Sequence, residues 1–215
     1  MRQKQDAKVY WIVIVALLLL TRLFFTAQFL SIDNVNLAFA LEYFDPLNNQ
    51  PQLPGYPFFV IFARLVNFFL GSVEYTFRFT SLLVSGLCLP LTVALGTRLF
   101  SVWTARAAAL LLLVNPVFWQ TGADSPLRPF LALFSLLVAY CAWRCWNGER
   151  RFVYWGAVAL GIGSGFRPEL LPYLFPLWVI SAWMGTQSIK DVLRGATIVE
   201  KTRPTAATAA ARLHP

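Results

Sequence analysis

The sequence predicts an all-α membrane protein that crosses the bilayer about six times. Of its 215 residues, 58% are hydrophobic and only 13% are charged, and the mean hydropathy is +0.59. Long uncharged runs alternate with short basic clusters, which is typical of spanning helices and of the loops that orient them. The net charge of +8 is spread over these clusters, so nucleic acid is not expected as a partner.

Seven apolar stretches follow one another along the chain. They cover residues 9–30, 56–70, 79–99, 107–119, 130–146, 152–165 and 170–184. The first is too long for the apolar part of a signal peptide, and no small-x-small cleavage site follows it. We therefore expect residues 1–8 to be a cytoplasmic N-terminus and the first stretch to be a retained helix. The glycines of GIGSGF favour close helix packing over nucleotide binding, because no strand precedes them.

The second stretch, 56–70, decides the topology. It has about 15 residues with Arg64 among them, fewer than the ~20 that a spanning helix needs. If it does not cross and the N-terminus is cytoplasmic, 13 of the 18 basic residues lie on the cytoplasmic side. A crossing would move ten of them outside, against the positive-inside rule. We therefore predict a re-entrant or surface helix at 56–70, six spanning helices, and a first extracytoplasmic loop at 31–78.

This loop carries the residues that favour catalysis. Asp33 follows the first stretch, and we expect it to cap a surface helix over 34–44 with Glu42 facing water. A carboxylate at a membrane surface is costly to place, and membrane proteins usually keep one there for chemistry. Four prolines and Gly55 then force an extended, turning segment with Asn and Gln side chains that can hydrogen-bond sugars.

The end of the chain changes character. It closes with TRPTAATAAARLHP, which is rich in Ala and Thr and has no apolar pattern. We predict a transmembrane domain over 9–185 and a disordered cytoplasmic tail over 186–215. The three cysteines have no metal-binding spacing and the single histidine is in the tail. The sequence thus predicts no metal site and identifies no cofactor, and it leaves assistance by a divalent metal open.

Several motifs follow the order that one known family has. Asp33 comes after the first stretch, followed by Phe44-Asp45, by Pro54-Gly55-Tyr56-Pro57, by GSVEYTFRFTSLL, by NPVFWQTGADSPL and by GFRPE. This layout resembles the GT-C glycosyltransferases, and most of all the bacterial relatives of the dolichyl-phosphate-mannose protein mannosyltransferases. The likeness covers about residues 9–185. Two positions depart from the family: Asn34 stands where a second acid is frequent, and Gln52-Leu53 stands where His-Pro is found.

The resemblance implies a GT-C fold and a reaction. A mannose-like hexose would pass from a polyprenyl-phosphate donor to a hydroxyl of a protein, lipid or glycan acceptor outside the cytoplasm. Asp33 would be the catalytic base that takes the proton of that hydroxyl. Arginine suits the donor phosphate because its fork binds two oxygens. The predicted substrate-binding residues are Arg167, Arg78, Asp124, Asp45, Gln52 and Tyr56.

Most of these residues also have a simpler explanation. Asp33 is also compatible with a helix cap, a role that does not exclude catalysis, and Asp45 and Asp124, each close before a proline, are compatible with turn caps. Arg78 and Arg167, at helix ends, are compatible with snorkelling to lipid headgroups.

Two other functions also fit the sequence. Members of the family are commonly longer, so the chain is alternatively a truncated, non-catalytic remnant, or a subunit completed by a second polypeptide. A binder or transporter of lipid-linked sugar fits less well, because it predicts charges in the middle of the membrane. In each case we expect an integral protein of a bacterial inner membrane, in contact with its lipids, with both termini cytoplasmic.

Overall fold

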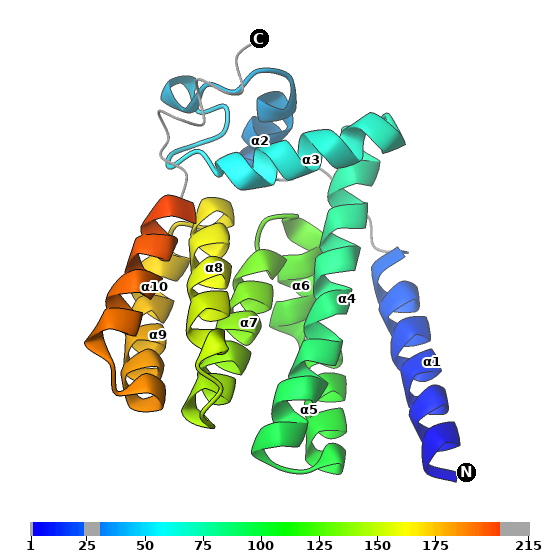
Figure 1. Ribbon diagram of the computed structural model, residues 1–215. Coiled ribbons are helices and arrows are strands. Elements are labelled where there is room, and N and C mark those ends of the chain that lie inside the picture. The colour runs from blue at the N-terminus through cyan, green and yellow to red at the C-terminus, as the bar shows by residue number, and fades with distance from the viewer. Residues whose placement is uncertain (1, 24–30, 203–215) are drawn as a thin grey trace.

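The computed structural model describes residues 2–23 and 31–202, and this part of the chain is helical throughout (Figure 1). It contains ten α-helices and one short 3-10 helix. They are α1 Arg2–Leu23, α2 Ile32–Glu42, η1 Pro46–Asn48, α3 Pro57–Leu70, α4 Val73–Leu99, α5 Val102–Val114, α6 Pro116–Asp124, α7 Pro129–Trp146, α8 Arg151–Phe166, α9 Leu170–Thr186 and α10 Ile189–Thr202. The prediction of an all-α protein is confirmed.

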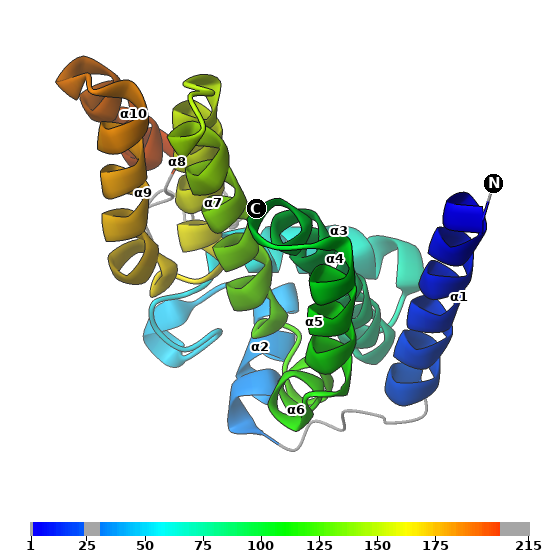
Figure 2. The same ribbon diagram turned by 90° about the horizontal axis from the view of Figure 1, so that it is seen from below.

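The helices form a bundle with a layer across one end. The longer helices run up and down side by side, whereas α2, η1 and α3 cover the upper end in Figure 1. Seen from below, α7 to α10 form one group, α4 to α6 form another, and α1 lies beside α4 (Figure 2). α3 contacts both α4 and α8 and does not run along the bundle. The sequence predicts a re-entrant or surface helix at 56–70, and the non-spanning role of α3 stays a prediction.

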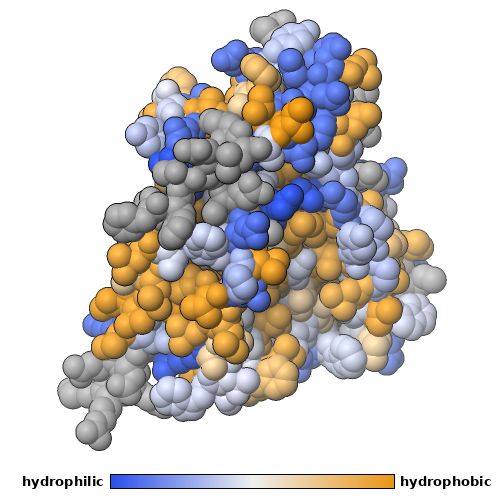
Figure 3. All heavy atoms as spheres, turned by 180° about the vertical axis from the view of Figure 1, so that it is seen from behind, coloured by the Kyte–Doolittle hydropathy of each residue, from blue (hydrophilic) through white to orange (hydrophobic). Residues whose placement is uncertain are grey.

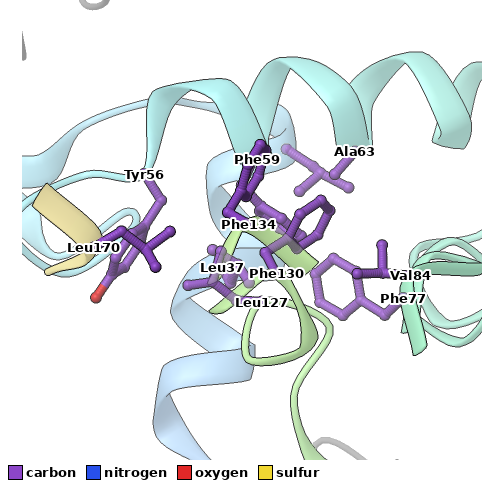
Figure 4. Close-up of a cluster of buried hydrophobic side chains, with 11 residues drawn as sticks. Leu37, Tyr56, Phe59, Ala63, Phe77, Val84, Leu127, Phe130, Phe134 and Leu170 are labelled. Atoms are coloured by element: carbon purple, nitrogen blue, oxygen red, sulfur yellow. The ribbon is translucent and has the colours of Figure 1, made fainter. Parts of the chain in front are cut away.

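One cluster of buried apolar side chains fastens this layer to the bundle (Figure 4). Phe59 of α3 is 0% exposed, and its ring centroid lies 6.0 Å from that of Phe130 in α7 and 6.1 Å from that of Phe77 in α4. Leu37 of α2 and Leu170 of α9 belong to the same cluster. Because aromatic rings bury large apolar areas, this contact fixes the layer relative to α4, α7 and α9 of the bundle.

Proline and its neighbours decide where two helices begin. Pro57 is the first residue of α3, where its fixed backbone angle favours a helix and its missing N–H costs nothing. The predicted helix over 107–119 is wrong, because the chain breaks at Asn115 into α5 and α6. Pro116 disfavours helical geometry in the residue before it. The Asn115 side-chain oxygen accepts a hydrogen bond of 3.0 Å from the N–H of Phe118 and so caps α6.

Two helices in the described residues, α4 and α7, are long and apolar enough to cross a membrane. Shorter apolar helices of 10–17 residues lie at Lys8–Thr21, α3, α5 and α9. Large hydrophobic side chains are exposed on the outside of the bundle, such as Leu111 at 69% and Ile180 at 56%. Figure 3 shows such side chains gathered over the lower part of the rear face. Six spans remain a prediction, since α4 and α7 alone among the described helices combine the length and the apolar composition that spanning requires.

Both ends of the chain differ from the expectation. α1 begins at Arg2, so the predicted N-terminal segment 1–8 is helical from its second residue, and the end of the predicted first span, 24–30, lies outside the described residues. The prediction of a disordered tail is wrong for residues 189–202, which form α10. α10 runs along α8 back toward the end that carries α3, so this segment does not stay at the predicted cytoplasmic end (Figure 1). Residues 203–215 lie outside the description.

α10 forms because its apolar residues repeat with the period of a helix. Val192, Ala196 and Val199 lie on one face and pack against the cluster between α8 and α9. Val199 is only 4% exposed, whereas Thr197 on the other face is exposed. The expectation of disorder gave too much weight to the Ala/Thr-rich end and missed this period.

The glycines of α8 allow neighbours to approach closely, as the sequence predicted. A side chain at Gly163 would come within 2.8 Å of the Phe134 ring, and one at Gly165 within 2.5 Å of Phe58. A side chain at Gly161 would collide with Thr202 of α10. α3, α7 and α10 therefore each approach the backbone of α8 closely.

Arg64 holds the end of α2. Its Nη2 donates hydrogen bonds to the carbonyl oxygens of Ala40 at 3.1 Å and Glu42 at 3.2 Å. These are carbonyls of the last turn of a helix, which have no partner within the helix and attract a cation. An arginine that the sequence placed at the outer end thus connects α3 to α2.

We expect Arg64→Met to loosen α2, because it removes charged donors from two carbonyls and costs about 1–3 kcal/mol. The thermal unfolding midpoint of the detergent-solubilised protein measures this loss. Arg151→Met, at a largely exposed arginine at the other end of the bundle, is the matched control. Equal midpoints for both variants would contradict the role of Arg64.

We expect Val199→Asp to detach α10, because an unpaired buried charge costs roughly 3 kcal/mol. Thr197→Asp places the same charge on the exposed face and should leave α10 in place. Limited proteolysis after Lys201 or Arg194 reports the difference. Similar cleavage rates in the two variants would show that α10 is not packed as described.

Candidate functional site

Part of the predicted set meets at one edge of the bundle end. Asp33 lies in the first turn of α2, Tyr56 directly precedes α3, and Arg167 lies between α8 and α9. Three segments far apart in the sequence thus converge there. Together with Glu169, which the sequence analysis did not single out, these residues are called the edge cluster below.

Tyr56 is the centre of the edge cluster. It is 6% exposed, and its ring lies beside Leu170 with its oxygen directed away from the phenylalanines of the core (Figure 4). Its backbone has φ 42° and ψ 52°, a left-handed conformation that few residues other than glycine adopt. Such a conformation persists only where the surroundings enforce it and is frequent at functional sites.

Burial and three charged groups set the pKa of the Tyr56 phenol. Burial raises the pKa of Tyr56, Arg167 lowers it, and the carboxylates of Glu169 and Asp33 raise it further. The three charged groups thus act on the phenol through space, from α2 on one side and from the segment between α8 and α9 on the other. Because the net direction is upward, the hydroxyl keeps its proton at neutral pH and can donate a hydrogen bond.

Arg167 is held on two sides. Its Cζ lies 5.7 Å from the centre of the Tyr56 ring, which is within the range of a cation–π contact. Its Nη2 donates to Glu169 Oε1 at 3.3 Å, and its Nε lies 3.2 Å from Glu169 Oε2 without the alignment of a hydrogen bond. The side chain of Arg167 is 16% exposed and that of Glu169 is 45% exposed.

Asp33 does not cap its helix, which corrects the expectation. Ser31 is the N-cap, and its hydroxyl oxygen accepts a hydrogen bond of 3.3 Å from the N–H of Asn34. Asp33 is exposed in the first turn, where the helix dipole favours a negative charge. Its carboxylate has no hydrogen-bond or ion-pair partner within 2–23 and 31–202. Glu42, at the other end of α2, is exposed as predicted.

Asp45 and Gln52 lie in the turning segment between α2 and α3. Asp45 caps η1: its carboxylate accepts from the N–H of Leu47 at 3.1 Å and from the amide of Asn48 at 2.6 Å. This is the turn cap that the sequence offered as an alternative. Gln52 belongs to the turn before Tyr56, and its buried Oε1 has no hydrogen-bond partner in the part of the chain that is described. Such an oxygen is available to a hydroxyl donor.

Two predicted residues lie elsewhere. Arg78 pairs with Glu74 and stands 6.0 Å from the Tyr75 ring, near the start of α4. This place is close to the C-terminal end of α3, whereas the edge cluster is at its N-terminal end. Asp124 is the last residue of α6, and its side chain lies outside the description. The edge cluster therefore includes Arg167 but not Arg78.

The chemistry of the edge cluster is that of an acid–base site for an anion. It offers the exposed carboxylate of Asp33, a neutral phenol, and an arginine paired with the second carboxylate, that of Glu169. A buried amide oxygen stands in the adjoining turn. No group of three or more His, Cys, Asp or Glu side chains that could hold a metal ion occurs in the described residues. The sequence signal for Glu169 was present in the segment GFRPE, but only the fold places it beside Arg167.

Comparison with known proteins was made by family model, by sequence and by structure. A family model described as dolichyl-phosphate-mannose-protein mannosyltransferase matches residues 50–194, which is 145 of the 215 residues. The match includes Gln52, Tyr56, Arg167 and Glu169, and it begins after Asp33. No curated protein and no solved structure matches. Because the match covers two thirds of the chain, the protein belongs to the dolichyl-phosphate-mannose-protein mannosyltransferase family, whose members are polytopic membrane glycosyltransferases of the GT-C type.

Proposed function

We propose that this membrane protein transfers a mannose-like hexose from a polyprenyl-phosphate donor to an acceptor hydroxyl outside the cytoplasm. The observation that carries the proposal is the convergence of Asp33, Tyr56 and Arg167 at one edge of the bundle. Family membership supports the class of donor. The edge cluster adds a base and a cation at the same place.

In the proposed reaction, the Asp33 carboxylate takes the proton of the acceptor hydroxyl as its oxygen attacks the anomeric carbon of the sugar. The bond from that carbon to the phosphate oxygen breaks, and the lipid phosphate leaves with the bonding electrons. Attack opposite the leaving group inverts the anomeric carbon. Arg167 and the Tyr56 hydroxyl are the donors that stabilise the charge on the phosphate.

The apolar bundle next to the edge cluster fits a lipid-linked donor. The polyprenyl chain stays in the bilayer while its phosphate reaches Arg167 at the end of α8. Gln52 is placed to accept a hydrogen bond from a sugar hydroxyl. In this arrangement α2 and α3 lie at the outer surface of a bacterial inner membrane, with six helices spanning and the N-terminus in the cytoplasm.

We expect Asp33→Asn to lower turnover by about a hundred- to ten-thousand-fold, because the amide cannot accept the proton. The measurement is mannose transfer from radiolabelled polyprenyl-phosphate mannose by membranes that contain the full chain. Glu42→Gln, at an exposed carboxylate of the same helix, is the matched control and should remain active. Equal, background-level signals from wild type and Asp33→Asn would favour a non-catalytic subunit that needs a second polypeptide.

We expect Arg167→Ala to cost roughly a hundredfold or more in turnover, since it removes a donor to the charged leaving group. Arg78→Ala removes an arginine whose side chain is 30% exposed and whose partner is Glu74. It lies outside the edge cluster, so its turnover should stay within about threefold of wild type. The same transfer assay tests both variants, and a larger loss for Arg78→Ala would reverse the assignment of the phosphate contact.

A further inference from the structure

We infer that Glu169 is a positioning residue: its carboxylate holds the Arg167 guanidinium against the Tyr56 ring, so that Nη1 faces the donor phosphate. The inference rests on the proposed function and adds a residue to it. It also assigns different tasks to the edges of one guanidinium group.

The planar guanidinium is restrained in two directions. The Tyr56 ring lies against it, with Cζ 5.7 Å from the ring centre. The edge that carries Nε and Nη2 faces Glu169, at 3.2 and 3.3 Å. Nη1 has no hydrogen-bond partner within the described segments. A rigid fork bound along one edge keeps donors on the other edge for a second anion.

The backbone places the two side chains on the same side. Arg167 is extended, with φ −143° and ψ 99°, as expected for a residue before proline. Its N–H donates to the carbonyl of Gly163 at 2.7 Å, and its own carbonyl accepts from Leu170 at 3.0 Å. Pro168 stands between Arg167 and Glu169 and limits the turn further. The pair is thus held by a short segment tied to both α8 and α9.

The pair contributes little to the stability of the fold. Glu169 is 45% exposed, and ion pairs with exposed partners are screened by solvent. The orientation of Arg167 affects the reaction rate more than the stability, because a small displacement of a reacting group has a large effect on rate. Loss of Glu169 should therefore impair turnover much more than thermal stability.

If Glu169 acted only through its charge, the effect of removing it on donor binding would have the opposite sign. Its negative charge opposes the attraction of Arg167 for a phosphate, and its removal would then tighten donor binding. If positioning dominates, removal weakens the interaction although the site becomes more positive. The direction of the change therefore distinguishes the two roles.

The matched control is Glu74, which pairs with Arg78 at the other end of α3 and has a side chain that is also 45% exposed. Glu169→Gln and Glu74→Gln each remove one carboxylate from an arginine. We expect Glu169→Gln to lower kcat for sugar transfer by roughly tenfold or more, and Glu74→Gln to change it by less than about twofold. Glu169→Asp, which keeps the charge, should recover part of the loss, and all variants should have the same thermal midpoint.

A second measurement separates this inference from the transferase activity. Binding of undecaprenyl phosphate to the purified full chain, followed by native mass spectrometry, needs no turnover. We expect Glu169→Gln and Arg167→Ala each to weaken it, and Glu169→Gln to have no further effect in the Arg167→Ala background, since one acts through the other. If the variants weaken binding in this way but the wild type transfers no sugar, the positioning role of Glu169 stands and the proposed function fails. Tighter binding by Glu169→Gln, or equal effects of Glu169→Gln and Glu74→Gln, would overturn the inference.

Discussion

The packing of α3 across the end of the bundle is the contact on which the other features depend. Phe59 and Ala63, each 0% exposed, rest on the rings of α4 and α7. Val60, also 0% exposed, packs with Ala40 and Phe44 of the α2 segment. Phe130 in turn stacks on Phe166 with ring centroids 4.4 Å apart. The two ends of α3 have different tasks: Tyr56 begins the edge cluster, and Arg64, two turns later, holds α2 and hence Asp33. An error in this packing would displace the base and the ring against which Arg167 lies.

The edge cluster combines groups with different access to water. Asp33 is exposed, Arg167 is half-buried against a ring, and Tyr56 is buried with its pKa raised. A carboxylate in water remains a charged base, whereas a cation next to low-dielectric surroundings attracts an anion more strongly. Access to water thus decreases from the layer of α2 toward the apolar bundle. An aqueous acceptor would reach the base from the exposed side, and a lipid-linked donor would reach the cation from the apolar side.

The glycines of α8 have a structural task that supports the site. They bring α3, α7 and α10 close enough that their side chains contact the backbone of α8. The end of α8 is thereby fixed next to Phe58 and the start of α3. Since Arg167 directly follows α8, close helix packing and placement of the cation are two consequences of the same glycine-rich segment.

The sequence by itself determined the features that depend on local pattern. Hydrophobic composition and period predicted an all-α membrane protein, and Asp45 before Pro46 predicted a turn cap. The helical spacing of apolar residues in 189–202 is also a local pattern. The prediction of disorder overlooked it, because the residues after 202 have no such spacing. The choice of Ser31 rather than Asp33 as the cap of α2 is local as well, since Ser31 accepts from the N–H of Asn34. Tertiary structure alone decided that Arg167 rather than Arg78 lies beside Tyr56, and that Glu169 belongs with them. Helix period and capping depend on neighbours a few residues away, whereas the meeting of α8, α3 and α2 depends on how buried rings pack between segments far apart in the chain.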